Sequence, residues 1–132
     1  MFKLHQTKDL YTVKAFLPFK KINDFFDLDL LFDPGCAVTL VNTSTIDLLG
    51  YSAKNDMTET SSLSGASGIS TGYIIKIPNL KCLGQELSNF EIACHDLDSN
   101  LGVSGLLGMN FFKHFRMDID FKRGLIHSVN KC

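Results

Sequence analysis

The sequence predicts a single, mainly β domain with one or two short helices. The chain has 132 residues, of which 45% are hydrophobic and 20% are charged. A chain of this length buries roughly two-thirds of its unfolded surface, so a core can form without disulfides or metal ions. Short runs of alternating apolar and polar residues are separated by turn-forming residues, which is typical of β-strands. We therefore expect one domain over residues 1–132.

The composition argues against several function classes. Thirteen basic and 14 acidic residues give a formal net charge of −1, whereas nucleic-acid-binding domains normally carry a basic excess. The sequence shows neither an apolar stretch long enough to span a bilayer nor the pattern of a secretory signal. The spacing of the four cysteines matches no zinc or redox motif and favours reduced thiols. We expect a cytoplasmic protein that binds no nucleic acid, membrane, metal or cofactor.

Two strands are predicted near the N-terminus. Residues 10–17 alternate apolar and polar side chains, and Pro18 ends this run. Residues 25–32 alternate in the same way and then become apolar throughout. This second strand stops at Asp33-Pro34-Gly35, a tripeptide that favours a tight turn because proline fixes φ and glycine accepts positive φ.

The middle of the chain predicts a strand, a helix and a hairpin. Residues 36–41 form a short apolar strand, and Ser44 is then placed as the N-cap of a helix that ends at Gly50. The stretch 52–72 is the most polar of the chain, and its glycines at 65–68 favour the tip of a hairpin.

The second half predicts further strands and a second helix. Residues 73–77 and 90–94 are apolar strand segments. Phenylalanines spaced on one helical face predict a helix over 109–115. Strict alternation over 117–121, followed by a turn and the run 125–129, predicts a terminal β-hairpin.

Two segments carry the chemistry. The first is the apolar strand that ends in Asp33-Pro34-Gly35-Cys36-Ala37, and the second is Leu106-Leu107-Gly108 at the start of the phenylalanine-rich helix. Each tripeptide alone is common in turns or cores. Their order, together with the polar hairpin between them and the terminal helix and hairpin, is much more specific.

At these residues the chain resembles the retropepsin-like aspartic peptidases. In that family an apolar strand leads into Asp-Thr-Gly or Asp-Ser-Gly and a small residue, which here reads Asp33-Pro34-Gly35-Cys36-Ala37. The second signature, two apolar residues and glycine before an acid or amide, reads Leu106-Leu107-Gly108-Met109-Asn110. The resemblance covers residues 10–130 and implies a closed β-barrel of the acid-protease type.

Catalysis in this family needs two carboxylates. Neighbouring aspartates cannot both ionise, so the pair shares a proton; one activates a water and the other protonates the substrate carbonyl. This chain has one Asp-x-Gly at the end of an apolar strand, so a second copy must supply the other Asp33. The resemblance implies a homodimer that hydrolyses peptide bonds of extended peptide or protein substrates, without a cofactor.

The resemblance also assigns roles around the catalytic Asp33. Gly35 is expected to orient the carboxylate, and Pro34 and Cys36 complete the active-site loop. The residues expected to support this loop are Leu106, Leu107, Gly108 and Asn110. The residues expected to form a flap over the substrate are Leu63, Ser64, Gly65, Ala66, Ser67, Gly68 and Ile69.

Pro34 departs from the family pattern. The hydroxyl found there in the family ties one loop to the partner's backbone, and proline has neither a hydroxyl nor an N–H. A symmetric dimer loses each contact twice, or about 2 kcal/mol at about 1 kcal/mol for each hydrogen bond. Proline does favour the extended backbone that Asp33 needs at a strand end. Two hypotheses therefore stay open: an active peptidase, or a catalytically impaired module for peptide binding or dimerisation.

A third hypothesis is a nucleophilic enzyme that uses Cys36 with one of the four histidines. No histidine lies in a motif that would place it beside Cys36. The spacing of Cys82, Cys94 and His95 fits no zinc pattern, so we expect these to be core or surface residues.

Overall fold

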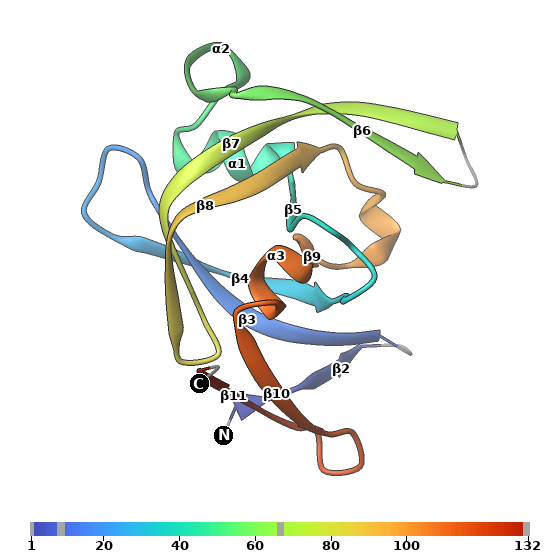
Figure 1. The fold of residues 1–132 in the computed structure, drawn as a ribbon. Coiled ribbons are helices and arrows are strands. Elements are labelled where there is room, and N and C mark those ends of the chain that lie inside the picture. Colours follow the sequence, from blue (N-terminus) through green and yellow to red (C-terminus); the bar gives the residue numbers. More distant parts are fainter. Residues whose placement is uncertain (1, 8–9, 66–67, 131–132) are drawn as a thin grey trace.

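The strands of the protein form two sheets around a shared core (Figure 1). The structure is a computed structural model that describes residues 2–7, 10–65 and 68–130. The smaller sheet has the strand order β1-β11-β10, and the larger has the order β2-β3-β4-β9-β5-β8-β7-β6. The strands of the smaller sheet are β1 (Phe2–Lys3), β10 (Phe115–Asp120) and β11 (Leu125–Asn130).

The larger sheet closes on itself. Its strands are β2 (His5–Thr7), β3 (Leu10–Pro18), β4 (Phe25–Phe32), β5 (Leu40–Asn42), β6 (Glu59–Gly65), β7 (Gly68–Cys82), β8 (Gln85–His95) and β9 (Gly105–Leu107). An additional pairing of β3 with β7 joins Ala15 to Cys82 and Phe16 to Lys81. The strands β3, β4, β9, β5, β8 and β7 thereby form a closed ring. The predicted mainly β fold with a closed barrel is confirmed.

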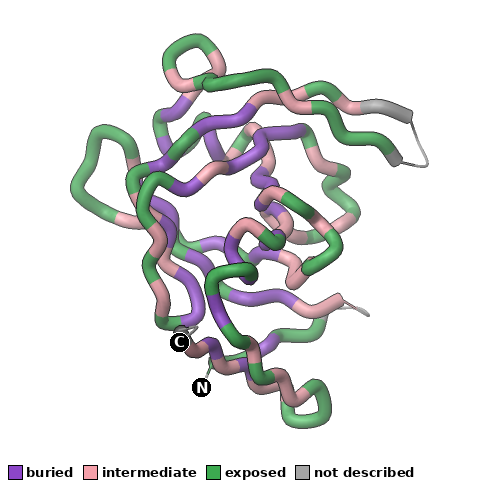
Figure 2. Tube along the Cα trace, viewed as in Figure 1, coloured by how far each residue is buried: buried purple, intermediate pink, exposed green. Residues whose placement is uncertain are grey.

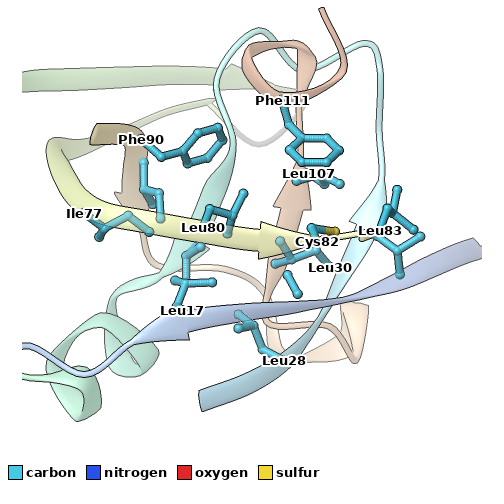
Figure 3. Packing of buried hydrophobic residues seen from close by; sticks show 14 of the residues in the cluster. Leu17, Leu28, Leu30, Ile77, Leu80, Cys82, Leu83, Phe90, Leu107 and Phe111 are labelled. Atoms are coloured by element: carbon cyan, nitrogen blue, oxygen red, sulfur yellow. The ribbon is translucent and has the colours of Figure 1, made fainter. Parts of the chain in front are cut away.

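Burial follows the alternation in the sequence. In β3 the side chains of Val13, Ala15 and Leu17 are fully buried, whereas Lys14 and Phe16 between them are exposed. Figure 2 shows how buried and exposed residues are distributed along the chain. Each buried leucine stabilises the fold by about 1.5–3 kcal/mol. Figure 3 shows a part of this core, with Leu17, Leu30, Ile77, Leu80, Leu107 and Phe111 among its members.

Strand β9 lies between β4 and β5 although it comes much later in the chain. It runs parallel to β4, where Phe32 is paired with Leu107, and antiparallel to β5, where Leu40 is paired with Leu106. A Cβ atom on Gly105 would lie 2.0 Å from the Leu40 carbonyl oxygen. Glycine is therefore needed where β9 passes β5, and this insertion brings the two signature segments together.

The polar middle segment forms the predicted hairpin. Strands β6 and β7 pair in a register that places Gly65 opposite Gly68, and residues 66–67 at its tip lie outside the described residues. The ladder between β7 and β8 begins only at Tyr73, so the part of β7 before it pairs with β6 alone. We call residues 61–65 and 68–72 the projecting hairpin.

The N-cap that the sequence predicts for the first helix needs correction. The described residues contain three short α-helices, α1 (Thr43–Leu49), α2 (Ala53–Asp56) and α3 (Met109–Phe112), and one 3-10 helix, η1 (Ser99–Leu101). The N-cap of α1 is Asn42, not Ser44, whose hydroxyl instead accepts a hydrogen bond from the Asn42 side chain at 2.9 Å. Gly50 ends α1 with φ of 97°, as expected. Within the described ranges, no helix combines the length and the hydropathy that crossing a membrane requires.

Two predicted boundaries were also wrong. The strand expected over 36–41 is limited to Leu40–Asn42, because the carbonyls of Cys36 and Ala37 accept hydrogen bonds from the backbone of α3 instead of a neighbouring strand. The helix expected over 109–115 ends at Phe112, because the chain from Phe115 onward pairs with β11. In both places contacts with distant residues override the local pattern.

Candidate active site

Asp33 stands at the end of β4, where that strand meets β9. Its backbone N–H donates to the Leu107 carbonyl at 3.1 Å, which continues the parallel β4–β9 pairing by one residue. The Asp33 side chain is half-buried. The apolar strand therefore delivers a single carboxylate to the edge of the barrel, at the point where the chain turns.

The residues after Asp33 form the tight turn that the tripeptide predicts. The Cys36 N–H donates to the Asp33 carbonyl at 3.1 Å, and the Gly35 N–H donates to Asp33 Oδ1 at 3.1 Å. Pro34 occupies the second position of this turn, where its fixed φ is favoured, and its side chain is exposed. The turn thus forms without a hydroxyl at residue 34. We call residues 33–39 the Asp33 loop.

Residues of the second signature hold this loop from behind. The Gly108 N–H donates to Thr39 Oγ1 at 3.0 Å, and a Cβ atom on Gly108 would lie 2.6 Å from the Cys36 carbonyl oxygen. Leu107 is fully buried in the main core, and Leu106 packs against a second cluster of buried residues. Gly108 and Leu107 thus contact the Asp33 loop directly, through hydrogen bonds to Thr39 and Asp33.

Asn110 is the centre of a hydrogen-bond network behind the loop. Its Oδ1 accepts from the Thr39 N–H at 2.9 Å and from the Thr39 hydroxyl at 2.8 Å, and its Nδ2 donates to the Glu91 carbonyl at 2.8 Å. Its backbone N–H also donates to the Ala37 carbonyl at 3.0 Å. One side chain thus ties the Asp33 loop both to α3 and to β8.

Thr39 was missed by the sequence analysis. It is fully buried, and its hydroxyl accepts from Gly108 while it donates to Asn110. The sequence did contain a signal for this role, since Thr39 is the hydroxyl residue within an otherwise apolar run. A hydroxyl in such a run is expected to be buried and therefore to need hydrogen-bond partners.

Cys36 lacks the properties of a nucleophile. Its Sγ–H donates to the Val38 carbonyl at 3.0 Å. Burial, followed by the negative charge of Asp33, raises the pKa of the thiol above its ordinary value. A reactive cysteine needs a lowered pKa, so this position does not favour the thiol mechanism.

The thiols of Cys82 and Cys94 are buried, and the His95 ring is paired with hydroxyl groups. Among the residues that the structure describes, no group of three or more His, Cys, Asp or Glu side chains is placed to hold a metal ion. Burial raises the pKa of both Cys82 and Cys94 to about 12. The nitrogens of the His95 ring contact Ser61 and Ser70 instead of a cysteine.

The expected flap residues fall on the projecting hairpin. Leu63 is 40% exposed and Ser64 is exposed, whereas Ala66 and Ser67 lie outside the described residues. The burial of the Ile69 side chain is not described, but its backbone lies in β7 opposite Ser64. In Figure 1 the projecting hairpin and the loop between β4 and β5 extend to the same side of the barrel.

Comparisons with known proteins agree with this arrangement. The family model described as "gag-polyprotein putative aspartyl protease" matches residues 20–114. A retropepsin-like aspartic protease from Rickettsia conorii has a similar structure, with a TM-score of 0.70, 20% sequence identity and 96% of each chain covered. The retroviral protease-like domain of Ddi1 from Leishmania major is also similar, with a TM-score of 0.60 and 14% identity over 98% of this chain and 92% of that chain.

No curated protein sequence matches this chain. The two structural relatives show the fold, and the family model spans both signature segments, from before Asp33 to beyond Asn110. The chain therefore belongs to the gag-polyprotein aspartyl protease family, which is retropepsin-like.

Proposed function

We propose that this protein is an aspartic endopeptidase that acts as a homodimer, with one Asp33 from each chain. The observation that carries the proposal is the placement of Asp33: it ends a barrel strand, it is only half-buried, and its carboxylate accepts the Gly35 N–H in a turn fixed by the second signature. The sequence has one Asp-x-Gly at the end of an apolar strand, so the chemistry of this family requires two chains.

In the dimer, the two Asp33 side chains would share one proton, because adjacent negative charges repel. The ionised carboxylate takes a proton from a bound water, and the water oxygen attacks the peptide carbonyl carbon. At the same time the protonated carboxyl gives its proton to the carbonyl oxygen. The C–N bond then breaks as the carboxyl that took the proton from water passes it to the nitrogen. The other carboxylate takes a proton back from a hydroxyl of the tetrahedral intermediate, which leaves a carboxylic acid and an amine. The projecting hairpins would lie over the extended substrate and bind its backbone.

The surface around Asp33 is suited to contact with a second copy. Pro34 and Ala37 are exposed, and Met109, whose N–H donates to the Cys36 carbonyl, is 40% exposed. These are apolar side chains in, or bonded to, the loop that carries the carboxylate. A symmetric contact would remove them from water and place the two Asp33 residues face to face.

Pro34 supports a second candidate function, a catalytically impaired module for peptide binding or dimerisation. The turn keeps its shape with proline, so the carboxylate stays oriented, but the residue offers the partner neither a hydroxyl nor an N–H. Under this alternative the fold and the projecting hairpin keep peptide binding, while the two carboxylates lie too far apart to share a proton.

One assay separates the two functions. The protein is incubated with a mixed peptide pool between about pH 4 and 6, where a shared-proton pair is populated, and Asp33→Asn is run beside it. We expect cleavage by the parent that Asp33→Asn removes; cleavage that persists in the variant would refute the assignment of Asp33. Inactivity of the parent, with cleavage by Pro34→Thr, would establish the impaired module. Sedimentation must show a dimer, and a strict monomer would overturn the proposal.

A further inference from the structure

His95 lies where the projecting hairpin leaves the barrel. It is the last residue of β8, one position beyond Cys94, which pairs with Tyr73 at the first rung of the β7–β8 ladder. From this rung outward, β7 pairs only with β6. The His95 side chain is nevertheless only 1% exposed. A buried polar ring thus lies at the base of a hairpin whose described strands pair, from this point outward, with each other.

The ring bridges both strands of the hairpin. Its Nε2 lies 3.0 Å from the Ser61 hydroxyl on β6, and its Nδ1 lies 3.3 Å from the Ser70 hydroxyl on β7. A neutral imidazole offers one donor and one acceptor, and each serine hydroxyl can serve as either. Both nitrogens are therefore satisfied, and each hydrogen bond joins the barrel strand β8 to a different strand of the hairpin.

Gly72 makes room for this bridge. A Cβ atom there would lie 2.1 Å from the Cys94 carbonyl oxygen and 2.8 Å from His95 Nδ1. The ring therefore occupies space that any larger residue at position 72 would fill. Three residues of the hairpin thus accommodate the ring: Gly72 leaves space for it, and Ser61 and Ser70 form its hydrogen bonds.

Burial lowers the pKa of His95, and the nearby negative charge of Asp96 opposes this shift. Asp96 is held by the Thr43 hydroxyl, which turns its carboxylate toward α1. The other acids on adjoining elements are Asp47 of α1 and the exposed Glu59 of β6, whereas β5 places the uncharged Asn42 opposite His95.

Tyr73 and Cys94 beside the ring are uncharged at neutral pH, because burial raises both of their pKa values to about 12. The bridge is consequently built for the neutral ring. Protonation would make both nitrogens donors, so that both serine hydroxyls would have to accept, and it would leave a charge in a buried site.

We infer that His95 is a positioning residue that fixes the projecting hairpin at its base through Ser61 and Ser70, so that substrate binding depends on it. The part concerning substrate rests on the proposed peptidase function; the part concerning the hairpin does not. His95 touches no reacting atom, and its effect reaches the substrate only through the orientation of the hairpin.

The test measures hydrogen exchange of backbone amides at constant pH near 7.5, where the ring is neutral. The variant Ser61→Ala/Ser70→Ala removes both partners without changing the core, and His95→Phe removes the ring nitrogens. We expect exchange to become about tenfold to thirtyfold faster in residues 61–65 and 68–72, with the amides of β3 and β4 unchanged. The control is His114→Gln, which changes an exposed histidine. Unchanged hairpin exchange in the double serine variant overturns the inference, as does an equal increase throughout the protein.

A second measurement separates this inference from the proposed function. With a cleaved peptide, the double serine variant should raise KM several-fold with little change in kcat, and His95→Gln, which keeps a donor and an acceptor, should restore part of the loss. Asp33→Asn should abolish cleavage and leave hairpin exchange as in the parent. If the parent cleaves nothing while the serine variants still release the hairpin, the peptidase assignment fails and the role of His95 stands. A fall in kcat with unchanged KM would refute the role in substrate binding.

Discussion

The Asp33 loop is bonded to α3, β8 and β9 on several sides, whereas the described residues of the projecting hairpin are hydrogen-bonded to the barrel at its base. Behind the loop, Asn110 and Thr39 form a buried hydrogen-bond network, and Gly108 lets two backbone segments approach closely. Among the described residues, the part of β7 before Tyr73 pairs with β6 alone, and the bridge at His95 joins the hairpin to β8. Changes behind the loop should therefore affect the stability of the whole domain, and changes in the hairpin should affect mainly substrate binding.

The largest effect is expected from Asn110→Ala. This change removes three hydrogen bonds and leaves the Thr39 N–H and the Glu91 carbonyl without their partner. We expect the free energy of unfolding to fall by about 3 kcal/mol, measured by urea denaturation. The matched control is the exposed Asn55, whose change to alanine should stay within about 0.5 kcal/mol. Equal effects of the two variants would contradict the importance of the network.

Gly108→Ala tests the close approach behind the loop. The new Cβ atom would lie 2.6 Å from the Cys36 carbonyl oxygen, and backbone would have to move, so we expect a loss of about 2 kcal/mol in thermal or urea unfolding. The rate of peptide cleavage should also fall under conditions where the variant remains folded, because the Asp33 loop itself is displaced. Gly102→Ala is the control: nothing lies within 4 Å of its Cβ, and only its φ of 68° resists the change. A larger destabilisation by Gly102→Ala would show that steric contact behind the loop matters little.

Pro34→Thr should strengthen the proposed dimer without stabilising the monomer. Threonine returns a hydroxyl and an N–H to each loop, which corresponds to about 2 kcal/mol per dimer and about a thirtyfold lower Kd. Sedimentation at several concentrations measures this change. Pro34→Ala returns the N–H alone and should give a smaller gain. If neither variant changes the Kd, residue 34 does not lie in the subunit contact.

The smallest effect is expected from the pH dependence of the hairpin. The folded-state pKa of His95 is lowered, so the unfolded chain binds the proton more readily. The stabilisation from the neutral ring is therefore complete above the unfolded pKa of about 6.5 and is lost as pH falls below it toward the folded pKa. Hairpin exchange, corrected for its intrinsic pH dependence, should rise in this window in the parent and not in His95→Gln. A parallel response of both proteins would exclude His95 as the cause.

Local patterns predicted much of the barrel. Residues 25–32 form β4 as expected, and residues 10–17 fall within β3, because alternation of period two directly reflects one buried face. The projecting hairpin also followed from its glycines and polar composition. The segment 36–39 was assigned incorrectly because its backbone partners lie in α3, far along the chain.

The same reason explains what was missed around the candidate site. The placement of Asp33 followed from the end of an apolar strand and its tripeptide, but the role of Thr39 depends on Asn110, which is 71 residues away. The partnership of His95 with Ser61 and Ser70 likewise depends on strand pairing that no local pattern encodes. Residues that act through a side chain from another element need the three-dimensional arrangement to be recognised.

The insertion of β9 between β4 and β5 also bears on the order of events as the chain is made. A ribosome has released β4 and Asp33 long before residues 105–110 emerge, and the Asp33 loop has no backing until they arrive. Closing so long a loop is slow compared with forming the local hairpins. A nascent or truncated chain ending before β9 would therefore be unable to assemble the carboxylate site, which delays any hydrolytic activity until synthesis of the domain is almost complete.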